Sequence, residues 1–246
     1  MKKALAALGI LGSMFVAFGH GGGGVFNTDD ASVVCNKEFE IGITGVVELP
    51  EHGEVGANLG ITYGIGDRFQ IGIENGFYVN KEHTDEYYFS NPELSLKFTL
   101  IEDVFAMKTF LTPGANSLEF GGMLIYSLEI PSFTKFNFNA GFESEQGAVE
   151  EQEQHGEEEH GHGSNHKAFT YSFSVIQPIN KFFLGAELFG EAFKDIDDDE
   201  KKPNWRVGAG YNFDTIILSL GFGGSFVSND DLKLKLGLTF FFGGDH

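Results

Sequence analysis

From Lys37 to the end of the chain, apolar and polar side chains alternate in segments of about ten residues. A period of two predicts β-strands with two different faces, because successive side chains of a strand point to opposite sides. About twelve such segments follow one another, and roughly ten residues is the length that a tilted strand needs to cross a bilayer. The segment Val104–Leu111 is apolar on both faces, so its alternation leaves its orientation open.

The connections between these segments alternate between tight turns and longer loops. The tight set is Gly64–Asp67, Ile101–Asp103, Pro131–Thr134, Pro178–Lys181 and Asp214–Thr215. The other set is Asn80–Ser90, Thr112–Ser117, Ser144–His166 and Lys194–Pro203, with the shorter Pro50–Gly53 and Ser228–Asp231. Short periplasmic turns and longer outer loops are typical of transmembrane β-barrels. The sequence therefore predicts an all-β fold, a single closed antiparallel up-and-down transmembrane β-barrel of about 12 strands over residues 37–242, with a tail at 243–246.

Composition decides which face of these strands points outward. The chain has 34 glycines and 27 phenylalanines among 246 residues, and Phe and Leu gather on one face while Gly, Ser, Thr, Asn and charges occupy the other. Glycine weakens a strand without packing anything, so a water-exposed glycine-rich face would be hard to explain in a soluble fold. Facing a lumen, small residues leave space and ease closure. We therefore expect lipid outside and water inside, with a secreted soluble β-protein as the alternative.

The start of the chain has the three-part layout of a secretory signal peptide. Two lysines precede an apolar stretch that ends at Phe18, and small residues stand ahead of a cut before His20. This stretch is too short to span a membrane as a helix, and no run of about 18 apolar residues occurs elsewhere. We expect a cleaved signal peptide at 1–19, a flexible glycine-rich segment at 20–36, and export to the bacterial outer membrane.

Charge, cysteine content and histidine placement exclude several function classes. The formal net charge is −20 at pH 7, which repels phosphate backbones, so we expect no nucleic-acid binding. The single cysteine, Cys35, excludes a disulfide scaffold and the usual cysteine zinc sites. Every histidine falls in the N-terminal segment, a predicted loop or the tail. A histidine oriented beside a nucleophile on the barrel wall is therefore not expected, and we do not expect an enzyme.

The pattern as a whole resembles bacterial outer-membrane β-barrels, and the resemblance covers most of the chain after residue 37. The final segment, 232–242, is similar to the terminal signal that the barrel-assembly machinery reads, although four residues follow the aromatic Phe242. Residues 59–72, with the sequence LGITYGIGDRFQIG, are similar to the strand–turn–strand of a proposed transporter family labelled "MetA-pathway of phenol degradation". The resemblance implies passage of small compounds, aromatic ones among them.

Charges of both signs fall on the face that we expect to line the lumen. The candidate pore-lining residues are Glu40, Arg68, Glu74, Lys97, Glu119, Lys135, Glu187, Arg206, Lys233 and Lys235. A narrow pore with acidic and basic walls would orient small polar solutes. The other interpretation is a plugged interior in which these charges pair. A barrel of about twelve strands is wider than the filled eight-stranded case and narrower than the large porins.

The loop Ser144–His166 is rich in glutamate and histidine. Imidazole and carboxylate groups suit divalent zinc, nickel, copper or cobalt, so His155, His160, His162 and His166 are candidate metal ligands. No rigid framework sets their geometry, and a solvated loop that is disordered when free is the alternative.

These observations favour a passive outer-membrane channel for small solutes that requires no cofactor. Its expected partners are outer-membrane lipid, the barrel-assembly machinery and the solute. The alternatives are a non-conducting structural or adhesive barrel, and a barrel whose loop captures divalent metal ions.

Overall fold

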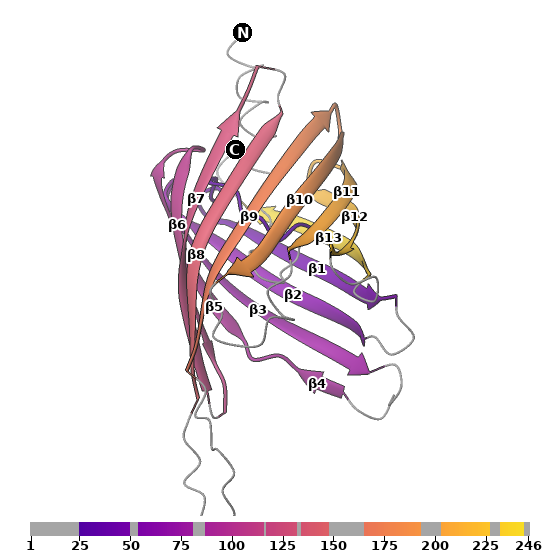
Figure 1. Cartoon of the computed structure of the whole chain (residues 1–246). Helices are drawn as coiled ribbons and strands as arrows, with labels where there is room; N and C mark the ends of the chain where they lie inside the picture. The colour runs from indigo at the N-terminus through magenta and orange to yellow at the C-terminus, as the bar shows by residue number, and fades with distance from the viewer. Residues whose placement is uncertain are drawn as a thin grey trace, which may run out of the picture.

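The computed structural model describes residues 25–49, 54–80, 87–115, 117–131, 134–147, 165–192, 203–226 and 232–243. In this part of the chain there are thirteen strands, which lie side by side around one barrel (Figure 1). They are β1 (Glu38–Glu48), β2 (Glu54–Ile65), β3 (Phe69–Asn80), β4 (Tyr87–Phe89), β5 (Glu93–Ile101), β6 (Phe105–Pro113), β7 (Ser117–Glu129), β8 (Lys135–Gly147), β9 (Asn165–Ile179), β10 (Phe182–Ala192), β11 (Asn204–Asn212), β12 (Ile216–Ser225) and β13 (Lys233–Gly243). Across these ranges, no helix is long and apolar enough to cross a membrane.

The sheet closes on itself through antiparallel pairs. β1 pairs with β2 on one side and with β13 on the other, and β2 in turn pairs with β3. The strands β4 and β5 both pair with β3, β4 along Phe77–Val79 and β5 along Phe69–Glu74. These two strands therefore share one position in the ring, and the thirteen strands make a closed barrel of twelve. The predicted fold class and strand number are confirmed.

The segment whose orientation the sequence left open forms β6. Ala106, Lys108 and Phe110 are buried on the inward face, and Met107 and Leu111 are exposed on the other. Both faces are apolar because Ala106 packs inside the barrel against a small apolar cluster of Ala31, Met123 and Ile125.

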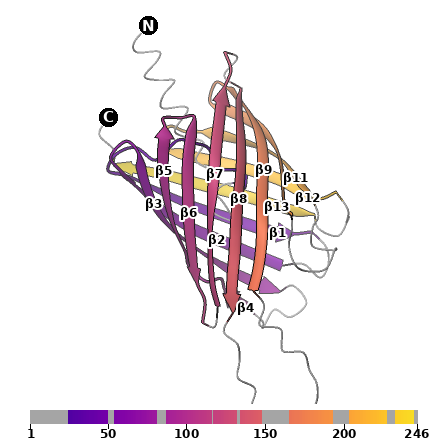
Figure 2. The same cartoon turned by 60° about the vertical axis from the view of Figure 1, so that its left-hand side comes forward.

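Tight turns close one end of the barrel, which we call the turn end. Four of the turn residues have left-handed backbone: Gly66, Asp103, Asn180 and Asp214, with φ values of 64°, 57°, 58° and 75°. Glycine adopts this conformation freely, and Asn and Asp tolerate it better than other side chains do. In Figure 2, β5 and β7 point toward the turn end, and β6 and β8 point toward the opposite, loop end. The pairing of Glu38 with Gly243 places the start of β1 and the end of β13 at the turn end.

The outward face of the barrel is apolar. Its exposed large side chains include Phe39, Ile43, Leu59, Ile73, Leu96, Leu124, Phe138, Leu188, Leu220 and Leu236. A water-soluble protein hides such side chains in its core, whereas a lipid-facing barrel presents them outward. The predicted orientation of the strands, with Phe and Leu outside, is confirmed.

The inward face is polar. Asn137, which is fully buried, lies between Phe136 and the exposed Phe138 on β8. Other buried polar side chains that face inward are Thr44, Asn58, Thr62, Ser127 and Ser174. The interior of this barrel therefore offers hydrogen-bonding groups where a soluble β-barrel would have an apolar core.

Candidate functional site

Residues Val25–Asn36, which precede β1, form what we call the luminal arm. Its part from Val25 to Val34 lies inside the barrel, and Cys35 is exposed. The arm enters at the turn end, where Lys37 N donates to Gly64 O at 3.0 Å and Gly66 N donates to the Asn36 side chain at 2.9 Å. Gly64 permits this close approach, since a Cβ there would lie 2.0 Å from Cys35 O. From this anchor at β1 and β2, the arm runs into the lumen.

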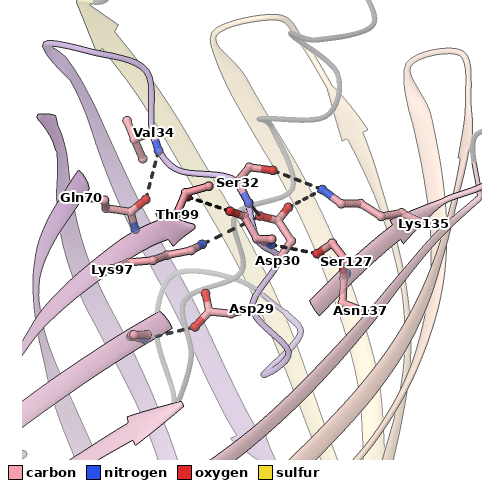
Figure 3. Close-up of polar contacts among 12 residues, drawn as sticks. Asp29, Asp30, Ser32, Val34, Gln70, Lys97, Thr99, Ser127, Lys135 and Asn137 are labelled. Atoms are coloured by element: carbon pink, nitrogen blue, oxygen red, sulfur yellow. Dashed lines mark hydrogen bonds and ion pairs between the residues drawn. The ribbon is translucent and has the colours of Figure 1, made fainter. Parts of the chain in front are cut away.

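The middle of the arm is held by polar side chains of the barrel wall (Figure 3). Val34 N donates to Gln70 of β3 at 3.0 Å, and Ala31 N donates to Ser127 of β7 at 2.8 Å. The hydroxyl of Thr99, on β5, donates to Ala31 O at 3.0 Å. The wall therefore satisfies backbone groups that a buried irregular segment would otherwise leave unpaired.

Two adjacent aspartates of the arm pair with three lysines of the wall, which we call the lysine cluster: Lys97 of β5, Lys108 of β6 and Lys135 of β8. Asp30 lies 2.8 Å from Lys135 and 3.9 Å from Lys97, while Asp29 lies 3.3 Å from Lys108 (Figure 3). All five side chains are almost completely buried. Burying a charge is costly unless it is paired, so each aspartate compensates the ammonium groups around it.

The other end of the arm reaches the opposite part of the wall. Thr28 donates from its backbone N and its hydroxyl to Glu187 of β10. Arg206 of β11 donates at 2.8 Å to both Val25 O and the Asn27 side chain, and at 3.2 Å to Glu187. The arm is thus bonded to strands on several sides of the barrel and crosses the lumen.

An apolar contact completes the docking of the arm. Val25 and Phe26 form a buried cluster with Ile176, Phe183 and Ile217 from β9, β10 and β12. The Phe26 ring lies over two glycines of the wall, where a Cβ would be 2.5 Å from the ring at Gly185 and 2.9 Å at Gly208. These glycines therefore leave the space that the ring fills.

Between the arm and the loop end, the lumen contains a cavity of about 530 Å³. Asn27 of the arm lines this cavity together with wall residues of both charges. On one side Tyr78 and Tyr88 stack at 5.2 Å between ring centroids. At the rim, Lys233 lies 2.5 Å from Glu48. A second, smaller cavity of about 170 Å³ also borders Asn27, so the arm limits both spaces.

The structure places nine of the ten candidate pore-lining residues on the inward face. Glu40, Lys97, Lys135, Glu187, Arg206 and Lys235 are buried, and Glu74, Glu119 and Lys233 are partly buried. Arg68 is the exception, because the turn that follows β2 occupies residues 66–68 and leaves this side chain exposed at the turn end. Arg68 therefore does not share the inward face of the strands with the other nine residues.

The luminal arm was not expected from the sequence. The sequence predicts a flexible segment at 20–36, whereas the structure holds Val25–Val34 inside the lumen through the contacts above. The arm has no periodic pattern, because its contacts are made singly with different strands. The adjacent acidic residues Asp29 and Asp30 were the available signal for this segment. Lysines such as Lys97 and Lys135 were already predicted to face the lumen, where they could pair with acidic side chains.

The side chains of the candidate metal ligands lie outside the part of the chain that the structure describes. His155, His160 and His162 lie outside the described residues, and so does the side chain of His166. Elsewhere, within the described ranges, no group of three or more His, Cys, Asp or Glu side chains is arranged to hold a metal ion.

Two solved porins are similar to this barrel. The NanC porin matches with a TM-score of 0.57 and 12% identity, over 82% of this chain and 98% of that one. The KdgM porin in complex with disordered oligogalacturonate matches with a TM-score of 0.56 and 9% identity, over 84% of this chain and 99% of that one. No protein-family model matches the chain, and no curated protein matches it in sequence. The chain therefore shares the barrel fold of these porins.

Proposed function

We propose that this protein is an outer-membrane β-barrel channel that lets small polar solutes pass passively. The observation that carries the proposal is the reversed polarity of the barrel, apolar outside and polar inside. The outer surface needs a hydrocarbon environment, and a closed barrel leaves no strand edge unpaired in lipid. Export by the predicted signal peptide at 1–19 and insertion by the barrel-assembly machinery belong to the same proposal.

The residues that line the lumen favour a channel for solutes over a barrel that is filled by a packed core. Charged side chains of both signs face inward, and the cavity between the arm and the loop end has a volume typical of small-molecule sites. Acidic Glu48 and Glu54 and basic Lys233 and Lys235 line this cavity, so a polar solute would meet hydrogen-bonding groups of both kinds. The similar KdgM porin was solved in complex with oligogalacturonate, which is consistent with a solute-conducting role for this fold. We propose transport and no catalysis.

A non-conducting barrel is the second candidate, because the luminal arm crosses the lumen. The arm's two aspartates and the lysine cluster are paired as the plugged alternative requires. The two candidates differ in one measurable property, which is the permeability of a membrane that contains the folded protein. Similarity of residues 59–72 to the phenol-degradation transporters and metal capture by the loop 144–166 stay predictions of the sequence.

Reconstitution tests the channel. We would incorporate the full chain, and a variant lacking residues 25–34, into phospholipid vesicles and planar bilayers, and verify the β-sheet spectrum of both by circular dichroism. We expect ion current in the bilayers and swelling of the vesicles in small polyols, and both should be larger for the variant. Protein-free membranes give the background. Folded protein that adds nothing to this background in either form would remove the channel and leave the structural barrel.

A further inference from the structure

The luminal arm is attached in a way that allows it to leave without opening the barrel. Residues 25–36 belong to none of the strands. Their contacts with the wall are made by single side chains such as Gln70, Ser127 and Glu187, and these side chains can bond water or solute instead. The ladder between neighbouring strands is independent of the arm. Withdrawal of the arm would therefore change the contents of the lumen and keep the sheet closed.

Withdrawal would also remove negative charge from the lysine cluster. Asp30 would leave Lys97 and Lys135, and Asp29 would leave Lys108, so the lumen would become more positive by two charges. The wall supplies part of the compensation, since Glu93 lies 3.7 Å from Lys108. Because buried ammonium groups need anionic partners, the emptied cluster would favour an anion in place of the two aspartates.

A further observation at the cluster points to a ligand. The Lys97 Nζ is buried, and among the described residues it has no hydrogen-bond partner even with the arm in place. An ammonium group has three donors, and its strongest partners are carboxylates, which form charge-assisted hydrogen bonds. The nearest anionic group of the arm, Asp30, stays 3.9 Å away. The cluster therefore has donor capacity that the arm does not use.

We propose that the lysine cluster is a binding site for carboxylate-bearing solutes in the channel, and that the luminal arm is a displaceable plug whose Asp29 and Asp30 occupy this site when no solute is bound. The proposal rests on the channel function and adds the chemical class of the solute. Two neighbouring carboxylates separated by a short chain, as in a small dicarboxylate, reproduce the charge of the two aspartates. Binding of such a solute and docking of the arm exclude each other.

The first test measures the position of the arm in the complete protein. Ser32→Cys is a nearly isosteric change at a buried arm position, made together with Cys35→Ser so that one thiol remains. We expect a maleimide reagent to label this thiol slowly in reconstituted protein, and about tenfold faster when succinate is added, because succinate competes with the arm. Erythritol, a neutral four-carbon solute, is the control and should leave the rate unchanged. Equal rates in both solutes would overturn the proposal.

The second test measures charge selectivity and does not depend on labelling. The double substitution Asp29→Asn and Asp30→Asn should raise the bilayer conductance and shift the reversal potential in a KCl gradient toward chloride, while Asp214→Asn, at an exposed turn, should do neither. In the variant lacking 25–34, succinate should reduce the chloride current in a saturable way, and the added change Lys97→Gln with Lys135→Gln should abolish this reduction.

The outcomes separate this proposal from the channel itself. If no form of the folded protein conducts, the channel function fails and the proposal fails with it. If all forms conduct equally and succinate has no more effect than erythritol, the channel stands, and the arm is a fixed part of its wall with no solute site behind it.

Discussion

Asp30 and Lys135 lie 2.8 Å apart inside the barrel, although 105 positions separate them in the chain. The pair joins the segment before the first strand to β8, on a distant part of the wall. Ser32 accepts a further hydrogen bond from the same Lys135 Nζ at 3.3 Å. An acidic residue that precedes the first strand thus pairs with a lysine in the middle of the sheet and holds the arm inside the barrel.

Loss of the Lys135 charge should strongly destabilise the protein with its arm docked in the lumen. In Lys135→Met, the buried Asp30 loses its closest partner, and breaking a buried pair in this way costs about 3–5 kcal/mol. We expect a loss of this size in the free energy of unfolding, measured with urea in lipid vesicles. The control is Lys181→Met, which removes an exposed pair with Asp214 and should cost less than about 1 kcal/mol. Equal losses for the two variants would contradict a specific role of the buried pair.

The two aspartates should differ in importance. Asp30 contacts two lysines, whereas Lys108, the partner of Asp29, also lies 3.7 Å from Glu93 and keeps that carboxylate when Asp29 is neutralised. We therefore expect Asp30→Asn to accelerate maleimide labelling of the Ser32→Cys thiol more than Asp29→Asn does. A reversed order would show that the arm is held mainly at Lys108.

Gly185 should be required for docking of Phe26. A methyl group at this position would lie 2.5 Å from the ring, and such overpacking costs typically about 1–3 kcal/mol. We expect Gly185→Ala to raise conductance by displacing the arm. The same substitution in a Phe26→Ala background should have little effect, because the ring is gone. Gly122→Ala is the control, since its nearest neighbouring atom would be 3.7 Å away. Non-additivity between Gly185 and Phe26 is the result to look for.

The lipid-facing surface gives a depth-dependent prediction. Leu220 lies in the middle of β12 and is half exposed on the outward face, so Leu220→Arg places a charge in hydrocarbon at a cost of about 2–4 kcal/mol. Phe213 is also exposed but lies at the turn end, where the same change should cost about 0–1 kcal/mol. Unfolding by urea in vesicles measures both. Equal costs would mean that this surface is not embedded in a bilayer.

The barrel could be predicted from the sequence because each strand places apolar side chains outside and polar side chains inside. Apolar and polar residues therefore alternate with a period of two along the sequence. Lys97 and Lys135 were placed inside correctly, since each alternates with outward apolar neighbours such as Leu96 and Phe136. The tight turns were also visible as short connections between the alternating segments. Two of them contain Asp103 and Asn180, which adopt left-handed backbone in the structure. Arg68 was misplaced because the alternation continues through the turn in the sequence, whereas the strand itself begins one residue later, at Phe69.

The arm could not be predicted by the same argument. A segment that crosses a lumen meets a different strand at each step, so its contacts produce no repeat in the sequence. Asp29 and Asp30 acquire partners only when β5, β6 and β8 are brought together around them. The sequence alone shows these residues as a short acidic stretch. Only the three-dimensional arrangement shows which lysines they pair with.

The seam between β1 and β13 has a consequence for biogenesis. Ile41 pairs with Phe240, so the ring can shut only after the C-terminal strand has been synthesised and delivered. By then the strands that carry Lys97, Lys108 and Lys135 have already been synthesised. The arm is continuous with β1, so it lies next to the open edge between β1 and β13. Pairing of β1 with β13 would enclose the arm in the same step that closes the barrel. A newly assembled molecule would therefore already have the arm in its lumen.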